Sequence, residues 1–268
     1  MSDFASIGGL TFHFRFEQHG LGLNAGVPVV FINSLGSDLR IWDDVVTTLK
    51  CSSLRYDKRG HGLSDAPPGP YSIADHANDL HGLLKHLNLE CVVIVGISVG
   101  GQIALEFASR FPERVNGAVF CDTGMKIGTA ELWDARIEAV RDRGLEHISG
   151  AVMQRWFAPD FRHDQATLVR GYQNMLERQP AVGYIATCEA LRQSDLHEAA
   201  QKVRDARMKT LVVCGKDDQS TPVALSQELV RTLETNLELI DDAGHLPCIQ
   251  QPQAFAKILN TFLEEVNA

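Results

Sequence analysis

The chain has 268 residues, of which 44% are hydrophobic, and carries a formal net charge of −9. This length and apolar content allow one large buried core, so we expect a single domain with an inserted cap. The negative charge opposes binding to phosphate backbones, and no cluster of Lys and Arg offsets it, which excludes nucleic acid as a partner. No apolar run approaches the ~20 residues of a membrane helix, and the first residues lack the pattern of a signal peptide. We therefore expect a soluble, cytoplasmic protein.

The six cysteines are far apart in the sequence and include no C-x-x-C pair. This usage is typical of a reducing compartment, so we expect free thiols that act as small core residues. Cys91, Cys121 and Cys214 lie in apolar, strand-like runs and are the clearest examples.

Short runs rich in β-branched residues alternate with longer amphipathic segments, which predicts an α/β fold with a mostly parallel sheet and helices on both faces. The predicted strands are residues 10–16, 28–33, 52–57, 91–96, 116–121, 209–214 and 237–240. The predicted helices are residues 38–50, 72–88, 98–110, 222–234 and 251–265. We expect Ser72 to cap the second of these helices and Pro222 to lie in the first turn of the fourth.

One long segment breaks this alternation. Residues 122–203 are helix-like, contain no convincing strand, and hold six of the nineteen aromatic residues. We interpret them as a helical lid inserted between two strands of a core formed by residues 1–121 and 204–268. Aromatic side chains at helical spacing usually serve packing, so most of these six are expected to pin the lid onto the core. They are Trp133, Trp156, Phe157, Phe161, Tyr172 and Tyr184.

The most informative motif follows the predicted strand 91–96. Residues 96–101 read GISVGG, which fits the pattern G-x-S-x-G at a turn from strand to helix. A serine at the apex of such a turn needs small residues two positions before and after it, because larger side chains would collide with the neighbouring strand and helix. Gly96 and Gly100 occupy these positions, so the pattern predicts Ser98 as a nucleophile.

A serine hydroxyl is a weak nucleophile at neutral pH and needs a base, which a third group orients. In such strand–turn–helix architectures the acid and the histidine follow the serine on loops after late strands. Among the ten histidines, His245 alone lies on such a loop and is the predicted base. Spacing from a preceding glycine and to a following proline favours Asp218 as the acid. Asp217 on the same loop and Asp122 at the end of an earlier strand are the alternatives.

Acyl transfer also needs two backbone N–H groups to bind the developing oxyanion. The first is expected at Val99, directly after the serine. For the second, in the loop after the predicted strand 28–33, we favour Leu35 over Ser34. The histidines are otherwise isolated or spread around a helix, so we expect neither a metal nor a cofactor.

These residues resemble the α/β-hydrolase family over nearly the whole chain, and within it the 3-oxoadipate enol-lactonases. In the core the resemblance lies in residues 33–43, 55–64 and 69–73, although Ile97 and Val99 depart from the Gly-Leu-Ser-Met-Gly-Gly of the family. Lids vary with substrate, so matches there bear more directly on specificity. They include Cys121, Thr123, Lys126–Gly128, Glu131, Trp133, Arg136–Ile137, Arg155–Phe157, Pro159 and Phe161.

The resemblance implies a serine hydrolase without cofactors that opens the ring of 3-oxoadipate enol-lactone to give 3-oxoadipate in the catabolism of aromatic compounds. This small substrate carries a carboxylate, for which the lid should supply an aromatic wall and a cation. Trp133 and Arg136 are the candidates, and a surface ion pair is the alternative role of Arg136. A generalist carboxylesterase or perhydrolase and a slow-turnover receptor for small molecules fit the same motifs. The sequence leaves the oligomeric state open.

Overall fold

The computed structural model describes residues 3–19, 26–49 and 51–267. The strands in this part are β1 (Asp3–Ile7), β2 (Leu10–Glu17), β3 (Val29–Ile32), β4 (Ser53–Tyr56), β5 (Val92–Ile97), β6 (Val115–Cys121), β7 (Lys209–Gly215) and β8 (Asn236–Ile240). They form one sheet in the order β1-β2-β4-β3-β5-β6-β7-β8. The pairings of β1 with β2 and of β2 with β4 are antiparallel, and the others are parallel. The predicted mostly parallel sheet is confirmed.

All seven predicted strands are present, and β1 is an addition. Only one of its five residues is buried, so its sequence carries no apolar alternation that could have revealed it. It pairs with β2 through a tight turn at Gly8 and Gly9, both of which have positive φ, a conformation that glycine adopts without strain.

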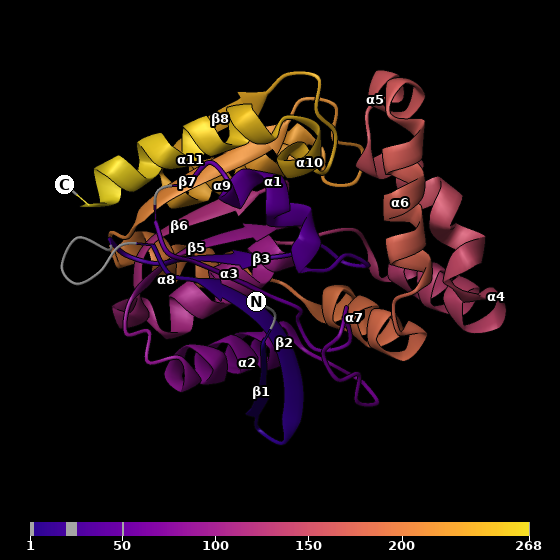
Figure 1. Cartoon of the computed structure of the whole chain (residues 1–268), viewed down its shortest axis with the longest axis horizontal. Helices are drawn as coiled ribbons and strands as arrows, with labels where there is room; N and C mark the ends of the chain where they lie inside the picture. Colours follow the sequence, from indigo (N-terminus) through magenta and orange to yellow (C-terminus); the bar gives the residue numbers. More distant parts are fainter. Residues whose placement is uncertain (1–2, 20–25, 50, 268) are drawn as a thin grey trace.

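Helices cover both faces of the sheet (Figure 1). One layer consists of α2 (Ile73–His86), α3 (Val99–Arg110), α8 (His197–Asp205) and α9 (Val223–Leu233). The other consists of α1 (Asp43–Val46), α10 (Pro247–Gln250) and α11 (Pro252–Asn267). Ser72 accepts a hydrogen bond from Asp75 N at the start of α2, as predicted, and Pro222 lies one residue before α9. Within the described ranges, no helix has the length and apolar sequence needed to cross a membrane.

The predicted helix 38–50 is wrong. In its place the chain forms a 3-10 turn, η2 (Leu39–Trp42), followed by the single turn of α1. Leu39, Ile41 and Trp42 are all buried, but Leu39 and Ile41 are two residues apart and would point to opposite sides of an α-helix, so the three cannot share one buried stripe. Lys50, the predicted end of this helix, lies outside the described residues.

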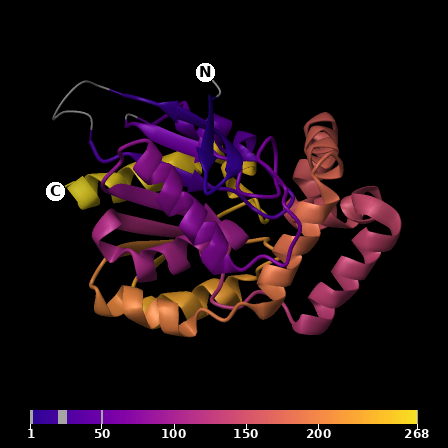
Figure 2. The ribbon, with the colours of Figure 1, turned by 90° about the horizontal axis from the view of Figure 1, so that it is seen from below.

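Helices α4 (Ala130–Trp156), α5 (Pro159–Asp164), α6 (Ala166–Glu177), α7 (Ala181–Gln193) and α8 separate β6 from β7, which confirms the helical insertion. Figures 1 and 2 show α4, α5 and α6 grouped beyond one end of the sheet. The division into a core of residues 1–121 and 204–268 and a lid of residues 122–203 stays a proposal, and residues 1–2, 20–25, 50 and 268 of that core are outside the described part. Its second boundary falls inside α8, which packs on the core helices α3 and α9.

The cysteines follow the expectation in part. All six are free thiols, and Cys121, Cys188, Cys214 and Cys248 are buried. Cys91 is exposed, so its predicted core position is wrong. It directly precedes β5, whose first residue is Val92, and therefore lies outside the buried run that it adjoins in sequence.

Candidate active site

Ser98 stands at the turn between β5 and α3. Its backbone has φ 61° and ψ −124°, a conformation that costs a residue with a side chain about 1–3 kcal/mol. Contacts with the surrounding structure hold it there. Its N–H donates to the Cys121 carbonyl of β6 at 3.0 Å, and its carbonyl accepts from Gly101 N at 2.9 Å and from the Thr123 hydroxyl at 2.7 Å. The hydroxyl is thereby presented on a rigid turn.

Gly96 and Gly100 leave room for this turn. A Cβ atom on Gly96 would lie 2.1 Å from the Gly100 carbonyl oxygen, and one on Gly100 would lie 2.3 Å from the Ile32 carbonyl oxygen of β3. Both distances are far inside van der Waals contact with backbone atoms that cannot move independently. The steric reason for small residues around Ser98 is therefore present in the fold.

Asp218 and His245 come from the loops after β7 and β8, which are neighbouring parallel strands. His245 Nδ1 lies 2.9 Å from Asp218 Oδ2, and both side chains are buried. Burial raises the pKa of Asp218, but the charge of His245 and hydrogen bonds from His245 and Thr221 outweigh it, so the pKa falls below its ordinary value. Asp218 is thus an anion that can orient the imidazole and stabilise its protonated form.

The two alternative acids are placed differently. Asp217 is exposed, and its N–H donates to the Ala243 carbonyl at 2.9 Å. Asp122 is buried, and its Oδ1 accepts from Gly215 N at 2.9 Å. Burial and the neighbouring charge of Asp218 raise the pKa of Asp122 well above its ordinary value, which favours its uncharged form. The geometry and the charges both favour Asp218 as the partner of the histidine.

Side-chain ligand atoms of Asp122, Asp218 and His245 all lie within 4.8 Å of one another, the one such group of three among the described residues. A metal site would require three deprotonated donors directed at a common point. Here His245 Nδ1 is directed at Asp218, and the raised pKa of Asp122 disfavours the carboxylate form that a metal would need. We interpret the group as a hydrogen-bonded network.

Thr221 belongs to this network and was not predicted. Its Oγ1 lies 2.6 Å from Asp218 Oδ2, 2.7 Å from the Asp122 carbonyl oxygen and 3.2 Å from His245 Nδ1. One hydroxyl carries one proton, so it donates to only one of the two oxygens at a time. A sequence signal for this loop is the run Asp-Gln-Ser-Thr before a proline. The side chain of an aspartate in such a turn commonly accepts hydrogen bonds from backbone N–H groups two and three residues later, as Asp218 does from Ser220 and Thr221.

A cavity of about 80 Å³ brings Ser98 and His245 together with Ser34 and Leu35. It is well below the ~300–1,000 Å³ of pockets for drug-sized ligands, so it suits a small acyl compound. Among the described residues, the N–H groups of Leu35 and Val99 donate to no protein acceptor, and the Ser98 hydroxyl has no hydrogen-bond partner. Serine and histidine share the cavity without a direct hydrogen bond, and such bonds commonly tighten only when substrate binds.

The lid forms the opposite wall of this cavity. Trp133 lines it and donates from Nε1 to the Ile127 carbonyl at 2.7 Å, which fixes the indole ring. Arg136 also lines it and contacts the Tyr184 hydroxyl at 3.2 Å. Arg155 is a third lining residue and has no hydrogen-bond or ion-pair partner in the described part of the chain. Arg155 and Tyr184 were not predicted as site residues, because only the packing of the lid helices turns them toward Ser98.

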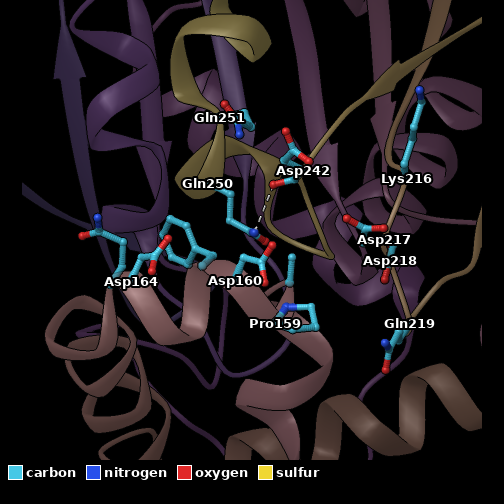
Figure 3. Close-up of a pocket in the computed structure, with 13 residues that line it drawn as sticks. Pro159, Asp160, Asp164, Lys216, Asp217, Asp218, Gln219, Asp242, Gln250 and Gln251 are labelled. Carbon is cyan, nitrogen blue, oxygen red and sulfur yellow. Dashed lines mark hydrogen bonds between the residues drawn. The ribbon is translucent and has the colours of Figure 1, made fainter.

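A larger cleft of about 850 Å³ lies between α5 and the loops after β7 and β8 (Figure 3). Its lining is acidic and rich in amides, and Gln250 of α10 donates to the Asp242 carbonyl of the preceding loop at 3.4 Å, on the side of the cleft that faces α5. Asp218 lines this cleft, but Ser98 and His245 do not. The smaller cavity is therefore the candidate active site, although the cleft has about ten times its volume.

A model of the family described as the alpha/beta hydrolase fold matches residues 19–252. The chain belongs to the α/β-hydrolase fold family. This α/β hydrolase is 35% identical over 242 residues to 3-oxoadipate enol-lactonase 2 of Acinetobacter baylyi, and the match covers 89% of each chain. It superposes on the enol-lactonase from Burkholderia xenovorans LB400 with a TM-score of 0.91 at 30% identity, over 98% of this chain and 100% of that one.

The family also contains esterases of the same shape. A thermophilic esterase from Thermogutta terrifontis, solved with malate bound, superposes with a TM-score of 0.89 at 25% identity over the full length of both chains. The resemblance drawn from the motifs is confirmed: the chain is an α/β hydrolase related to enol-lactonases.

Proposed function

We propose that this α/β hydrolase opens the ring of 3-oxoadipate enol-lactone to give 3-oxoadipate. The observation that carries the proposal is the pair of arginines, Arg136 and Arg155, that the lid adds to the cavity holding Ser98 and His245. A generalist esterase needs no cation beside its nucleophile, whereas a guanidinium group matches the geometry and charge of a carboxylate. The kinship with enol-lactonases of Acinetobacter and Burkholderia supports the same substrate.

The proposed reaction begins when Ser98 attacks the ring carbonyl carbon and His245 Nε2 takes the serine proton. Asp218 holds the imidazole in the required tautomer and stabilises its charge. The N–H groups of Val99 and Leu35 bind the tetrahedral oxyanion. These donors are fixed before substrate arrives, which is why they stabilise the transition state at little cost in reorganisation.

Collapse of the tetrahedral intermediate breaks the bond from the acyl carbon to the ring oxygen and expels an enolate. The enolate is a good leaving group because its charge is delocalised. The proton that His245 took from Ser98 is released to it, so that protonation on carbon gives the ketone and His245 is neutral again. Water, deprotonated by His245, then attacks the acyl-enzyme and releases Ser98 with the second carboxylate of the product. No step needs an electron acceptor, and water is the second substrate.

Steady-state rates with two substrates test the proposal. We expect kcat/KM for enzymatically generated 3-oxoadipate enol-lactone to exceed that for p-nitrophenyl acetate by about 10–100-fold, since one charge-assisted hydrogen bond contributes roughly 1.5–3 kcal/mol. Equal or faster hydrolysis of the aryl ester would assign a generalist carboxylesterase. Turnover of both substrates far below ~10 per second would instead favour a receptor that retains the fold.

Arg155→Leu should raise KM for the enol-lactone by about tenfold or more with a smaller change in kcat, because Arg155 binds the substrate carboxylate away from the reacting carbonyl. The rate with p-nitrophenyl acetate should be unaffected, since that ester carries no carboxylate. Arg143→Leu is the matched control: Arg143 is exposed on the same helix, α4, and does not line the cavity. A KM unchanged in the Arg155 variant would remove this residue from the binding site.

A further inference from the structure

Lys58 is a buried lysine directly beneath the loop that carries Leu35. It lies two residues after β4, is 1% exposed, and donates from Nζ to the Ser34 carbonyl at 2.7 Å. The same carbonyl accepts from the Ser37 hydroxyl at 3.0 Å and from Ser37 N at 3.3 Å. Burying an ammonium group is unfavourable, and this carbonyl already has two other donors. The need of the Ser34 carbonyl for hydrogen-bond donors therefore does not explain why a lysine is buried at this position.

The hydrogen bond from Lys58 Nζ to the Ser34 carbonyl affects the proposed oxyanion donor, the Leu35 N–H, through one peptide group. The Ser34 carbonyl and the Leu35 N–H belong to the same peptide, which is trans, because the one cis peptide in the described ranges is Gly69–Pro70. A trans peptide is planar and directs its C=O and N–H to opposite sides. A cation at the oxygen withdraws electron density from the nitrogen and strengthens the N–H as a donor. Leu35 lines the cavity, and no described residue accepts from its N–H.

The next peptide of the loop is held by His61. Gly36 N donates to His61 Nε2 at 3.0 Å, so Nε2 is unprotonated, and the ring proton lies on Nδ1, which is 3.3 Å from the Arg59 carbonyl oxygen. Burial and the charge of Lys58 lower the pKa of His61 well below its ordinary value. Lys58 therefore also helps to keep His61 in the form that accepts from the loop.

We propose that Lys58 is a positioning residue for acyl transfer, which fixes and polarises the Leu35 N–H through the Ser34–Leu35 peptide. It touches no substrate and acts only when negative charge develops on the carbonyl oxygen. The inference rests on the proposed nucleophilic role of Ser98, but it does not depend on which lactone or ester is the substrate.

The charge that this role requires depends on pH. Burial lowers the pKa of Lys58 to about 7, while the carboxylates of Asp57 and Asp38 oppose the shift. His61 and His76, the other titratable groups facing Lys58, have pKa values well below the ordinary one, so they stay neutral. As pH rises through about 7 the cation is lost, and kcat should fall on the alkaline side.

The test compares Lys58→Met and Lys58→Gln with the wild type, on p-nitrophenyl acetate and on the enol-lactone. The methionine has a similar length and no charge, and we expect it to lower kcat by about 10–100-fold with KM nearly unchanged, somewhat less than the loss of a whole oxyanion donor. The glutamine keeps a neutral donor and should lose less. Lys85→Met, an exposed lysine of α2, is the control and should match the wild type.

Two further measurements, the pH dependence of kcat and the melting temperature, distinguish this role from a purely structural one. The Met variant should lose the alkaline decline in kcat and should melt no lower than the wild type, because a buried cation is replaced by an apolar group of similar volume. A kcat within twofold of wild type, or a parallel fall in kcat and melting temperature with the alkaline decline retained, would overturn the proposal. If neither variant folds, the wild type decides: a kcat that does not change across the titration of Lys58, followed by NMR of the isotope-labelled lysine, would overturn the proposal.

The aryl ester keeps this test independent of the substrate assignment. If Ser98 hydrolyses p-nitrophenyl acetate but not the enol-lactone, the proposed function fails while the effect of Lys58 can still be measured. If both substrates are turned over and the Lys58 variants behave as wild type, the proposed lactonase function is retained and the proposed positioning role of Lys58 is rejected.

Discussion

Replacing Ser98 by alanine should lower kcat by about a million-fold on both the enol-lactone and p-nitrophenyl acetate, with KM close to that of the wild type. The size of the effect follows from the turn. The structure fixes Ser98 in a strained conformation that presents its hydroxyl, and no other serine hydroxyl in the described part is held at such an apex beside His245. The side chain makes no hydrogen bond to the described residues, so its loss should leave the fold intact.

Ser109→Ala is the matched control for this change. Ser109 lies on the same helix, α3, and its hydroxyl donates to the Glu106 carbonyl at 2.9 Å, away from the cavity. We expect this variant to keep wild-type kcat. If the Ser98 variant retained more than about a thousandth of the activity, the loss would be too small for a nucleophile, and the assignment of the turn would be wrong.

Asp218→Asn should lower kcat by about ten-thousandfold, because the amide cannot stabilise the protonated imidazole and favours the wrong tautomer. Asp122→Asn should cost less than about tenfold. The raised pKa of Asp122 favours an uncharged side chain at this position, and an amide oxygen can accept the same bond from Gly215 N. Asp217→Asn, at an exposed position, should behave as wild type.

The measurement is kcat at the pH optimum for the three variants, with melting temperatures to show that each is folded. A large loss in the Asp122 variant together with a small one in the Asp218 variant would transfer the role of the acid to Asp122. Equal losses would mean that the two carboxyl groups act as one unit, whose contributions single changes cannot divide.

The sequence predicted the sheet well because its strands are buried on both faces and read as continuous apolar runs. β5, with the sequence VVIVGI, is buried at every residue. The same reasoning failed where the buried residues do not follow the periodicity of a strand or an α-helix. β1 is mostly exposed, and the segment Leu39–Trp42 buries three of its four side chains in a 3-10 turn. In each case tertiary contacts decide a structure that local periodicity cannot show.

The residues of the candidate site likewise divide into those that the sequence predicted and those that only the structure shows. Ser98 and His245 could be proposed from the sequence because the turn around the serine needs glycines at fixed spacing and the histidine lies on a late loop. Lys58 could not, since nothing in its local sequence marks it. Thr221 and Arg155 lie in stretches with a sequence signal, a loop motif and a family resemblance, but neither signal shows that the side chain reaches the site. Their roles follow from what they contact across the fold. Thr221 contacts the Asp122 carbonyl 99 residues away, Arg155 lines the cavity beneath the lid, and Lys58 donates to a carbonyl 24 residues away.

The break in α4 has a consequence for substrate length. Gly144, with φ 76° and ψ 175°, divides that helix into two arms, and Arg136 and Arg155 lie on opposite sides of it. The backbone angles of Gly144 therefore influence how the helical segments that carry the two arginines are oriented, while Ser98 and His245 follow strands of the sheet. Under the proposed function, the residues that would bind the substrate carboxylate and the residues that would cleave the ester therefore lie in separate parts of the chain. Substitutions at the break in α4 could then change the preferred substrate length while Ser98 and His245 keep their positions.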